Sequence, residues 1–416
     1  MSKKNIVVIT LGYYPDMSPV SAVIDKYIQV LKGRYHFHII ALPTRLNFDR
    51  FNDPDIDIYY MNNYMRPLLL KYDERYKGNP TLIDKMIFHS LRVRSFLMGL
   101  KEPYSSLKWM KKAAYDLLES ISKTVKIDAV VSVSGLFLYL HEAACKFKEK
   151  NPQVKWITFV TDPISFSSSD YKRFRINEKR RFLSSYNKEK EIYDSADYNI
   201  FTENLYVDAV EKFHQSQNKT FQFKFVLENI QSECSDVSVR KSGSIRLLYA
   251  GALYKVIRNP EYMLSVISKV PNIQLDMFVR SFECMDILKK YESDTIIIHD
   301  GVDIKKYREM ICNEYDILIN IGNNCKNQLP SKTLELLSSG RPIINFYYYK
   351  DSQYEMIDKY PLGLNIGRED ADAKTKVELF CNKMCGKQLT FEEVEQLYPD
   401  YSLENQKQIL ESLINS

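Results

Sequence analysis

The first forty residues alternate between apolar runs and an amphipathic stretch. Residues 5–10 form an apolar run typical of a buried strand, and residues 12–19 form a loop with one glycine and two prolines. Val23, Tyr27 and Leu31 then share one face at helical spacing, and residues 37–42 indicate a second strand. Because parallel sheets bind ligands at the carboxyl ends of their strands, we expect Gly12 and the loop after it to line a cleft.

The same alternation continues through the chain, with one interruption. Residues 129–133, 156–161, 197–201 and 225–227 indicate strands, and residues 139–149 and 205–214 indicate helices. A polar segment, 231–244, breaks the rhythm and is expected to be a linker. The pattern restarts with strands at 245–249, 273–279, 295–299, 317–321 and 342–346, and with a helix at 260–270.

This pattern predicts an α/β protein with two Rossmann-like open parallel-sheet domains that face each other across a cleft. A length of 416 residues fits two such domains. We place an N-terminal domain at 1–235, with a basic helical insertion at about 61–124. A C-terminal domain follows at 236–400, and the helix at 401–416 is one that can pack back on the first domain.

Composition narrows the class of protein. Hydrophobic residues make up 45% of the chain and charged residues 27%, as in ordinary globular proteins. Neither a signal peptide nor an apolar run long enough to span a membrane is evident, and the seven cysteines are scattered without paired metal-ligand spacing. These features favour a cytoplasmic protein.

The net charge of +5 is unevenly distributed. Residues 65–112 hold eleven lysines and arginines against four aspartates and glutamates, interleaved with apolar side chains. Peripheral contact with an anionic membrane explains this segment as well as a solvated helical face does, and both readings stay open. No recognised motif accompanies the charge, so we expect no nucleic-acid partner.

The segment 328–342, QLPSKTLELLSSGRP, carries the strongest motif. It resembles the donor-binding segment of glycosyltransferase family 4 in the GT-B superfamily, as found in bacterial surface-polysaccharide enzymes. The resemblance implies that Pro330, Ser331 and Lys332 open a helix whose positive end binds a diphosphate, and that Glu335 accepts hydrogen bonds from a ribose. Asn327 stands where the family has an earlier glutamate that contacts the transferred sugar. An amphipathic helix without a ligand is the alternative.

Two further segments resemble the same family. In residues 247–260, LLYAGALYKVIRNP, Gly251 would let phosphate approach the backbone, and Arg258, with Lys255 as a weaker candidate, would neutralise it. In residues 298–324 the resemblance implies backbone contacts to the base near Gly301 and Val302. His299 is better explained as a packed residue at a strand end.

The N-terminal half matches the family in outline. The resemblance implies that 1–235 is the acceptor-binding domain, with Gly12 on the acceptor side, and that 236–400 is the nucleotide-sugar-binding domain. Residues 134–144, SGLFLYLHEAA, are similar to an acceptor-side turn and helix, which assigns Ser134 and Gly135 to that side. Residues 156–165, WITFVTDPIS, are similar to a strand that ends in a functional aspartate, which makes Asp162 a candidate catalytic carboxylate. An N-cap or turn role for Asp162 is the alternative.

The resemblance implies a glycosyltransferase that moves a sugar from a nucleoside diphosphate to a saccharide or lipid-linked acceptor, with retention, in surface-polysaccharide synthesis. Arg258 and Lys332 would stabilise the leaving phosphate, so no cofactor and no metal are expected; Asp55 and Asp57 are read as an incidental pair. Two alternatives are a nucleotide-sugar 2-epimerase and a catalytically silent sugar-nucleotide-binding protein.

Overall fold

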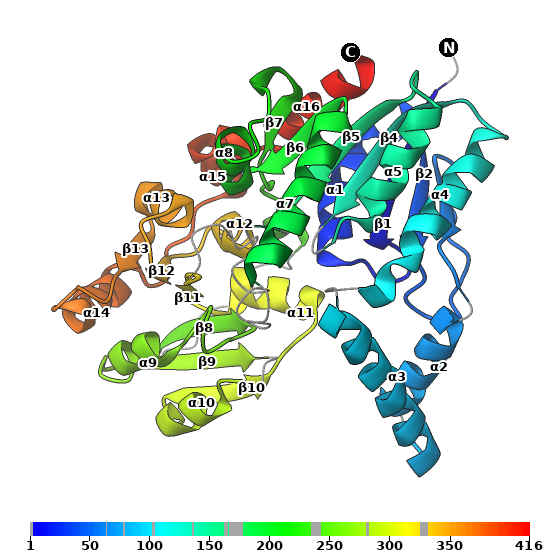
Figure 1. Ribbon diagram of the computed structural model, residues 1–416. Coiled ribbons are helices and arrows are strands. Elements are labelled where there is room, and N and C mark those ends of the chain that lie inside the picture. The colour runs from blue at the N-terminus through cyan, green and yellow to red at the C-terminus, as the bar shows by residue number, and fades with distance from the viewer. Residues whose placement is uncertain are drawn as a thin grey trace. The chain divides into compact units, whose positions relative to one another are not determined.

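The chain divides into two compact units, Met1–Lys224 with Gln406–Ser416, and Phe225–Asn405. The computed structural model describes residues 3–63, 65–77, 80–101, 105–134, 137–161, 165, 178–233, 243–279, 283–324 and 332–416 (Figure 1). Each unit is described by itself below. Within the described residues, no helix is both long and apolar enough to cross a bilayer.

The first unit is built on a seven-stranded sheet in the order β3-β2-β1-β4-β5-β6-β7, in which every neighbouring pair is parallel. Its strands are β1 (Lys4–Gly12), β2 (Tyr35–Leu42), β3 (Ile56–Tyr60), β4 (Ile127–Ser134), β5 (Lys155–Val160), β6 (Tyr198–Thr202) and β7 (Thr220–Phe223). Its helices are α1 (Pro19–Leu31), α2 (Met65–Lys77), α3 (Leu82–Lys101), α4 (Trp109–Ser122), α5 (Tyr139–Lys150), α7 (Glu178–Ser195), α8 (Glu203–Glu211) and α16 (Leu403–Asn415).

Helices cover both faces of this sheet, which is why its strands are nearly continuous apolar runs. Val7, Ile40 and Trp156 point into a core shared with α4, α5 and α7. Side chains of the opposite parity face α1, where the Tyr27 ring lies edge-on to Phe159. The predicted strand–helix–strand opening is therefore present.

Two helical additions extend the first unit. Helices α2 and α3 form a hairpin in which the rings of Tyr76 and Phe88 stack with centroids 4.1 Å apart. The last helix, α16, returns to the start of β2, where Glu411 accepts a 2.8 Å hydrogen bond from Arg34 and Asn415 donates one of 2.8 Å to the Tyr35 hydroxyl.

The second unit contains a six-stranded parallel sheet in the order β10-β9-β8-β11-β12-β13. Its strands are β8 (Ile245–Gly251), β9 (Ile273–Val279), β10 (Ile296–Asp300), β11 (Ile317–Ile321), β12 (Ile343–Phe346) and β13 (Gly363–Ile366). Its helices are α9 (Glu261–Ile267), α10 (Met285–Tyr291), α11 (Ile304–Glu309), α12 (Lys332–Ser338), α13 (Ser352–Lys359), α14 (Ala373–Met384) and α15 (Phe391–Leu397).

Helices again lie on both faces of the sheet. Leu247 and Ile319 pack with α9, α10 and α14, whereas Leu248 and Leu318 pack with α11, α12 and α13. Helix α12 ends at Ser338, and Gly340, whose φ of 72° favours glycine, closes the turn into β12. The prediction of two open parallel sheets with helices is confirmed.

Three strand assignments from the sequence need correction. The prediction of a strand at 225–227 is wrong: β7 ends at Phe223, and the Leu227 amide donates instead to the Tyr401 carbonyl at 2.9 Å. Strand β3 was missed inside what looked like a polar stretch, and β13 was missed as well. Both lie at sheet edges, where one flank is open and polar residues are tolerated, which weakens the apolar pattern.

Candidate nucleotide-sugar site

The carboxyl ends of β8 and β11 flank a recess in the second unit. Its lining includes the predicted residues Arg258 and Lys332, together with Tyr249, Tyr307 and Asn320. Gly251 is the last residue of β8, and α12 begins at Lys332. The recess therefore lies where a parallel sheet presents ligand-binding loops.

Lys332 reaches across to the end of β8. Its ammonium group donates a 3.1 Å hydrogen bond to the Ala250 carbonyl and lies 4.9 Å from the centroid of the Tyr307 ring. A Cβ on Gly251 would lie 3.6 Å from Lys332 Nζ and 3.3 Å from the Tyr249 hydroxyl. The glycine thus keeps the space beside the ammonium clear of a side chain.

Arg258 reaches the same recess from the loop after β8. Its guanidinium donates two hydrogen bonds to the Asn323 side-chain oxygen, at 3.1 and 2.8 Å. An amide oxygen is a neutral acceptor, so Asn323 orients the guanidinium without neutralising its charge. Two cationic groups from separate segments consequently meet at one recess.

Two buried tyrosines border these cations. Burial raises the pKa of Tyr249 to about 12, although the neighbouring Arg258 acts in the opposite direction. Burial also raises the pKa of Tyr307, and the negative charge of Glu335 adds to the effect. Both phenols therefore keep their protons at neutral pH and can act as hydrogen-bond donors.

Glu335 lies one turn beyond Lys332 on α12, with its side chain 22% exposed. Its Oε1 lies 3.8 Å from Arg308 Nη2, and the same nitrogen is 2.5 Å from Glu228 Oε2. Arg308 therefore pairs more closely with Glu228 than with Glu335.

Other predicted donor residues lie outside the recess lining. The Lys255 ammonium pairs with Asp286 at 2.7 Å on an exposed surface. Gly301 and Val302 form the turn between β10 and α11, and Val302 packs beside the core that includes Tyr307. His299 is packed as expected, because its ring stacks on Phe278 with centroids 4.4 Å apart and its Nε2 lies 2.9 Å from Asp276.

Five of the predicted site residues lie outside the described residues: Asn327, Pro330, Ser331, Asp162 and Gly135. Ser134 is the last residue of β4. Gly12 ends β1, where a Cβ would lie 2.6 Å from the Thr44 methyl carbon, so packing requires a glycine there.

An asparagine ladder beside the recess was not predicted from the sequence. Asn320 donates to Asn345 at 2.7 Å, and Asn345 donates to Asn365 at 2.8 Å, which links β11, β12 and β13. The available signal was a single polar residue at the same point of each apolar strand. Tyr249 and Tyr307 were also missed, since neither belongs to a motif.

Comparison with known proteins locates the fold but gives no close relative. No protein-family model matches the chain, and no curated protein matches it significantly in sequence. Among solved structures, sucrose-phosphate synthase from Thermosynechococcus elongatus superposes with a TM-score of 0.61 at 11% identity, over 99% of this chain and 98% of the other.

Two further solved structures agree with this match. HepE from Anabaena, in complex with UDP and glucose, gives a TM-score of 0.59 at 7% identity, over 99% of this chain and 100% of the other. WaaG, a glycosyltransferase involved in lipopolysaccharide biosynthesis, gives 0.55 at 8% identity, over 99% of this chain and 98% of the other. The chain has the GT-B fold. At these identities the likeness establishes the GT-B architecture and not the reaction.

Proposed function

We propose that this protein is a glycosyltransferase that moves a sugar from a nucleoside diphosphate donor to a hydroxyl acceptor. The observation that carries the proposal is the meeting of Arg258 and Lys332 at the carboxyl ends of β8 and β11, in a chain with the GT-B fold. Two cations beside a glycine suit a diphosphate.

The proposed chemistry assigns a role to each of these groups. The bond between the anomeric carbon and the diphosphate breaks, and the leaving phosphate keeps the electron pair. Arg258 and Lys332 stabilise the negative charge that develops on it, and Glu335 holds the ribose hydroxyls. The acceptor hydroxyl bonds to the anomeric carbon on the face that the phosphate leaves, and its proton passes to the phosphate, which retains configuration. Asp162 is the proposed carboxylate on the acceptor side.

UDP is the first nucleotide to test. HepE is described in complex with UDP and glucose, and a trehalose-6-phosphate structure from E. coli is described with UDP-2-fluoro glucose. We expect UDP to raise the melting temperature of the full chain more than UMP does, because only UDP carries the second phosphate that the two cations would bind.

Donor turnover separates the proposal from its alternatives. A transferase releases UDP from a UDP-sugar slowly alone and faster with acceptor, tested with a lipid extract and with free saccharides. An epimerase changes the sugar without releasing UDP, and a silent binder does neither. Arg258→Gln and Lys332→Met should abolish release, whereas Lys290→Ala, which removes an exposed cation of α10, should not.

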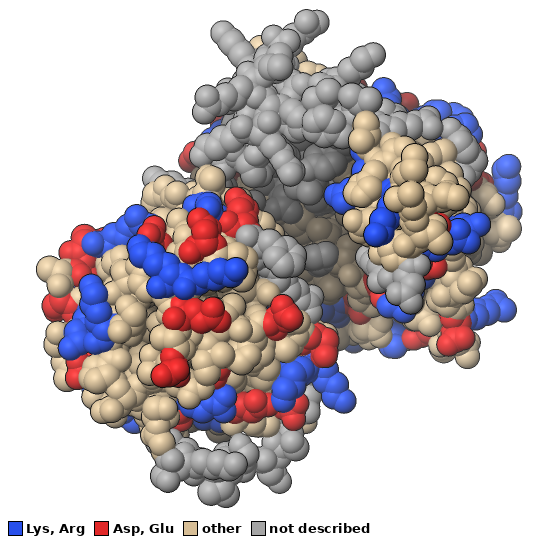
Figure 2. Space-filling view, turned by 90° about the horizontal axis from the view of Figure 1, so that it is seen from below, with Lys and Arg blue, Asp and Glu red and all other residues tan. Residues whose placement is uncertain are grey.

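We further propose that the protein binds an anionic membrane through the α2–α3 hairpin and meets its acceptor there. The reaction would serve surface-polysaccharide synthesis on the cytoplasmic side. Leu82, Ile83, Met86 and Val93 are 56% to 76% exposed, within the basic segment 65–112. At the right of Figure 2, the end of this hairpin shows mostly uncharged surface with blue groups around it, whereas the second unit on the left mixes both charges. Apolar side chains that insert into the bilayer, with lysine and arginine side chains around them, favour binding to anionic lipid.

Vesicle sedimentation tests the membrane proposal. The triple variant Leu82→Gln, Ile83→Gln and Met86→Gln should lose binding to vesicles that contain phosphatidylglycerol, and wild type should bind pure phosphatidylcholine weakly. Leu379→Gln, at a leucine of α14 that is 65% exposed, is the matched control and should bind normally. Equal sedimentation of wild type and triple variant would show that the hairpin is a solvated surface.

A further inference from the structure

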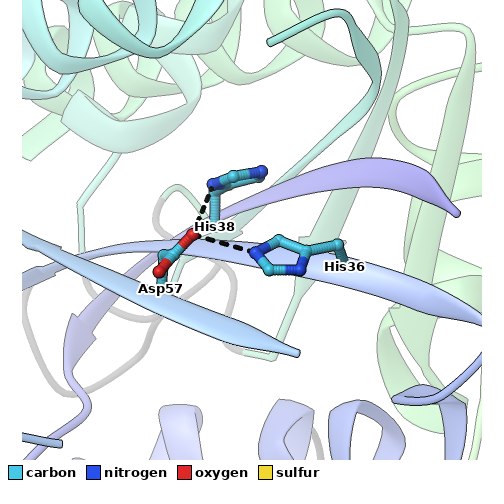
Figure 3. A group of neighbouring side chains, drawn as sticks. All are labelled: His36, His38 and Asp57. Atoms are coloured by element: carbon cyan, nitrogen blue, oxygen red, sulfur yellow. Dashed lines mark hydrogen bonds and ion pairs between the residues drawn. The ribbon is translucent and has the colours of Figure 1, made fainter. Parts of the chain in front are cut away.

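Two histidines and an aspartate converge at the amino ends of β2 and β3, in the first unit. His36 Nε2 lies 2.9 Å from Asp57 Oδ2, and His38 Nδ1 lies 3.6 Å from the same oxygen. Figure 3 shows both rings turned toward the carboxylate, with dashed lines from its oxygen to each. The three ligand atoms lie within 4.8 Å of one another.

The strand geometry explains this convergence. His36 and His38 are two residues apart on β2, so both side chains leave the same face of the sheet. His38 is paired in register with Asp57 of the parallel strand β3, which places the carboxylate on that face as well. A His-x-His pair beside an in-register aspartate on the neighbouring strand therefore forms a cluster without any special loop.

A hydrogen bond to Asn5 prepares His38 as a ligand. Asn5 Nδ2 donates to the Lys126 carbonyl at 3.0 Å, which fixes the amide so that its oxygen faces His38 Nε2 at 3.2 Å. With its proton on Nε2, the ring turns the lone pair of Nδ1 toward Asp57. Metal-binding histidines are commonly held by such an outer partner, which sets the tautomer and the ring orientation.

The three side chains of the cluster differ in their exposure to solvent. The His38 side chain is 3% exposed and that of His36 is 27% exposed, whereas Asp57 is 55% exposed and gives an ion a route from solvent. Burial lowers the pKa of His38, and the neighbouring His36 ring adds to this effect. Metal binding requires the neutral form of a histidine, and a lowered pKa favours that form.

We propose that His36, His38 and Asp57 bind a zinc ion that ties β2 to β3. Zinc bonds of 2.0 to 2.2 Å in a tetrahedron place ligand atoms about 3.3 Å apart. The two distances from Asp57 Oδ2, 2.9 and 3.6 Å, bracket that value, and the two histidine nitrogens, which lie within 4.8 Å, would move closer to it when zinc binds. Two imidazoles, one carboxylate and water supply the four positions that zinc prefers. The Tyr59 hydroxyl, 3.3 Å from His38 Nδ1, donates to this nitrogen when no metal is present, and zinc displaces it.

Metal content tests this proposal. The untagged full chain, treated with chelator and dialysed against zinc, should retain one zinc per chain and give the visible spectrum of tetrahedral Co²⁺ when loaded with cobalt. His36→Ala and Asp57→Asn alter partly exposed positions, so both should fold and lose the ion. His89→Ala, an exposed histidine of α3 outside the cluster, is the matched control and should retain it.

Two variants test the assignment of ligands. Asn5→Ala should weaken zinc binding by about 10- to 100-fold, as the loss of an outer partner does. Tyr59→Phe should bind zinc at least as tightly as wild type, because the hydroxyl competes for His38. The proposal is overturned if wild type retains no zinc, if His36→Ala retains as much as wild type, or if Tyr59→Phe loses the ion.

Discussion

Replacing Lys332 with methionine tests the donor site most directly. Methionine keeps the unbranched stem that reaches the Tyr307 ring but removes the ammonium group that lies 3.1 Å from the Ala250 carbonyl. Ala250 is only partly buried, so water can replace the lost donor there. The folded structure should therefore survive the substitution.

The expected loss follows from a single interaction. A hydrogen bond from an ammonium group to a charged phosphate contributes about 1.5–3 kcal/mol, and a loss of about 2 kcal/mol weakens binding roughly thirtyfold. At a UDP concentration 100 times the wild-type dissociation constant, UDP stabilises the wild type by about 2.7 kcal/mol and the Lys332→Met variant by only about 0.9 kcal/mol.

Calorimetric titration and thermal denaturation with UDP measure both quantities. Far-UV circular dichroism and the melting temperature without nucleotide check that the variant is folded. Lys290→Ala serves as the control for a general loss of positive charge. A folded Lys332→Met protein that binds UDP within about threefold of wild type would refute the role of Lys332 and the diphosphate site built on it.

Three further variants probe the same unit. Gly251→Ala should fold but weaken UDP binding roughly tenfold, about 1.4 kcal/mol by titration, because the added methyl group fills the space beside the cations. Burial raises the pKa of Asp276, but hydrogen bonds from His299 and Arg246 outweigh it and the net pKa is lowered. The ionised Asp276 therefore adds to the unfolding free energy above its unfolded pKa of about 3.9, and this contribution is lost as pH falls through the folded pKa. Asp276→Asn should lower the unfolding free energy at pH 7 and weaken its decrease at acid pH, as measured by urea denaturation at several pH values. Gly340→Ala should cost more than about 1–2 kcal/mol of unfolding free energy, because φ is 72° there and a Cβ would lie 2.0 Å from the Leu389 carbonyl oxygen; an unchanged denaturation midpoint would contradict this.

Strands buried on both faces were predictable from the sequence, whereas edge strands were not. The limits of β9 and β11 agree with the prediction, because apolar side chains predominate in both and both lie in the interior of a sheet. In β3, Asp57 interrupts the apolar residues, since its side chain faces solvent at the amino end of the strand. The same residue that hid this strand belongs to the histidine and aspartate cluster.

The candidate donor site was predicted in part. A motif could bring Arg258 and Lys332 together, because each follows a recognisable strand and turn. It also ranked Arg258 above Lys255, which lies three residues earlier and pairs with Asp286 instead of lining the recess. It could not find Tyr307, since this helix residue meets Lys332 only through tertiary packing.

The two proposed sites lie in different sheets, one at the carboxyl ends of its strands and the other at the amino ends. Each should respond to its own ligand separately. UDP would bind after the carboxyl ends of β8 and β11, where loops meet, whereas zinc would bind at the amino ends of β2 and β3, within the ladder itself. Ligand binding suppresses local opening around its own site. Zinc should therefore slow amide exchange in 35–60, and UDP should slow it in 249–258 and 332–338. Protection of 35–60 by UDP alone would show that this segment responds to the donor, and would contradict the assignment of a separate metal site.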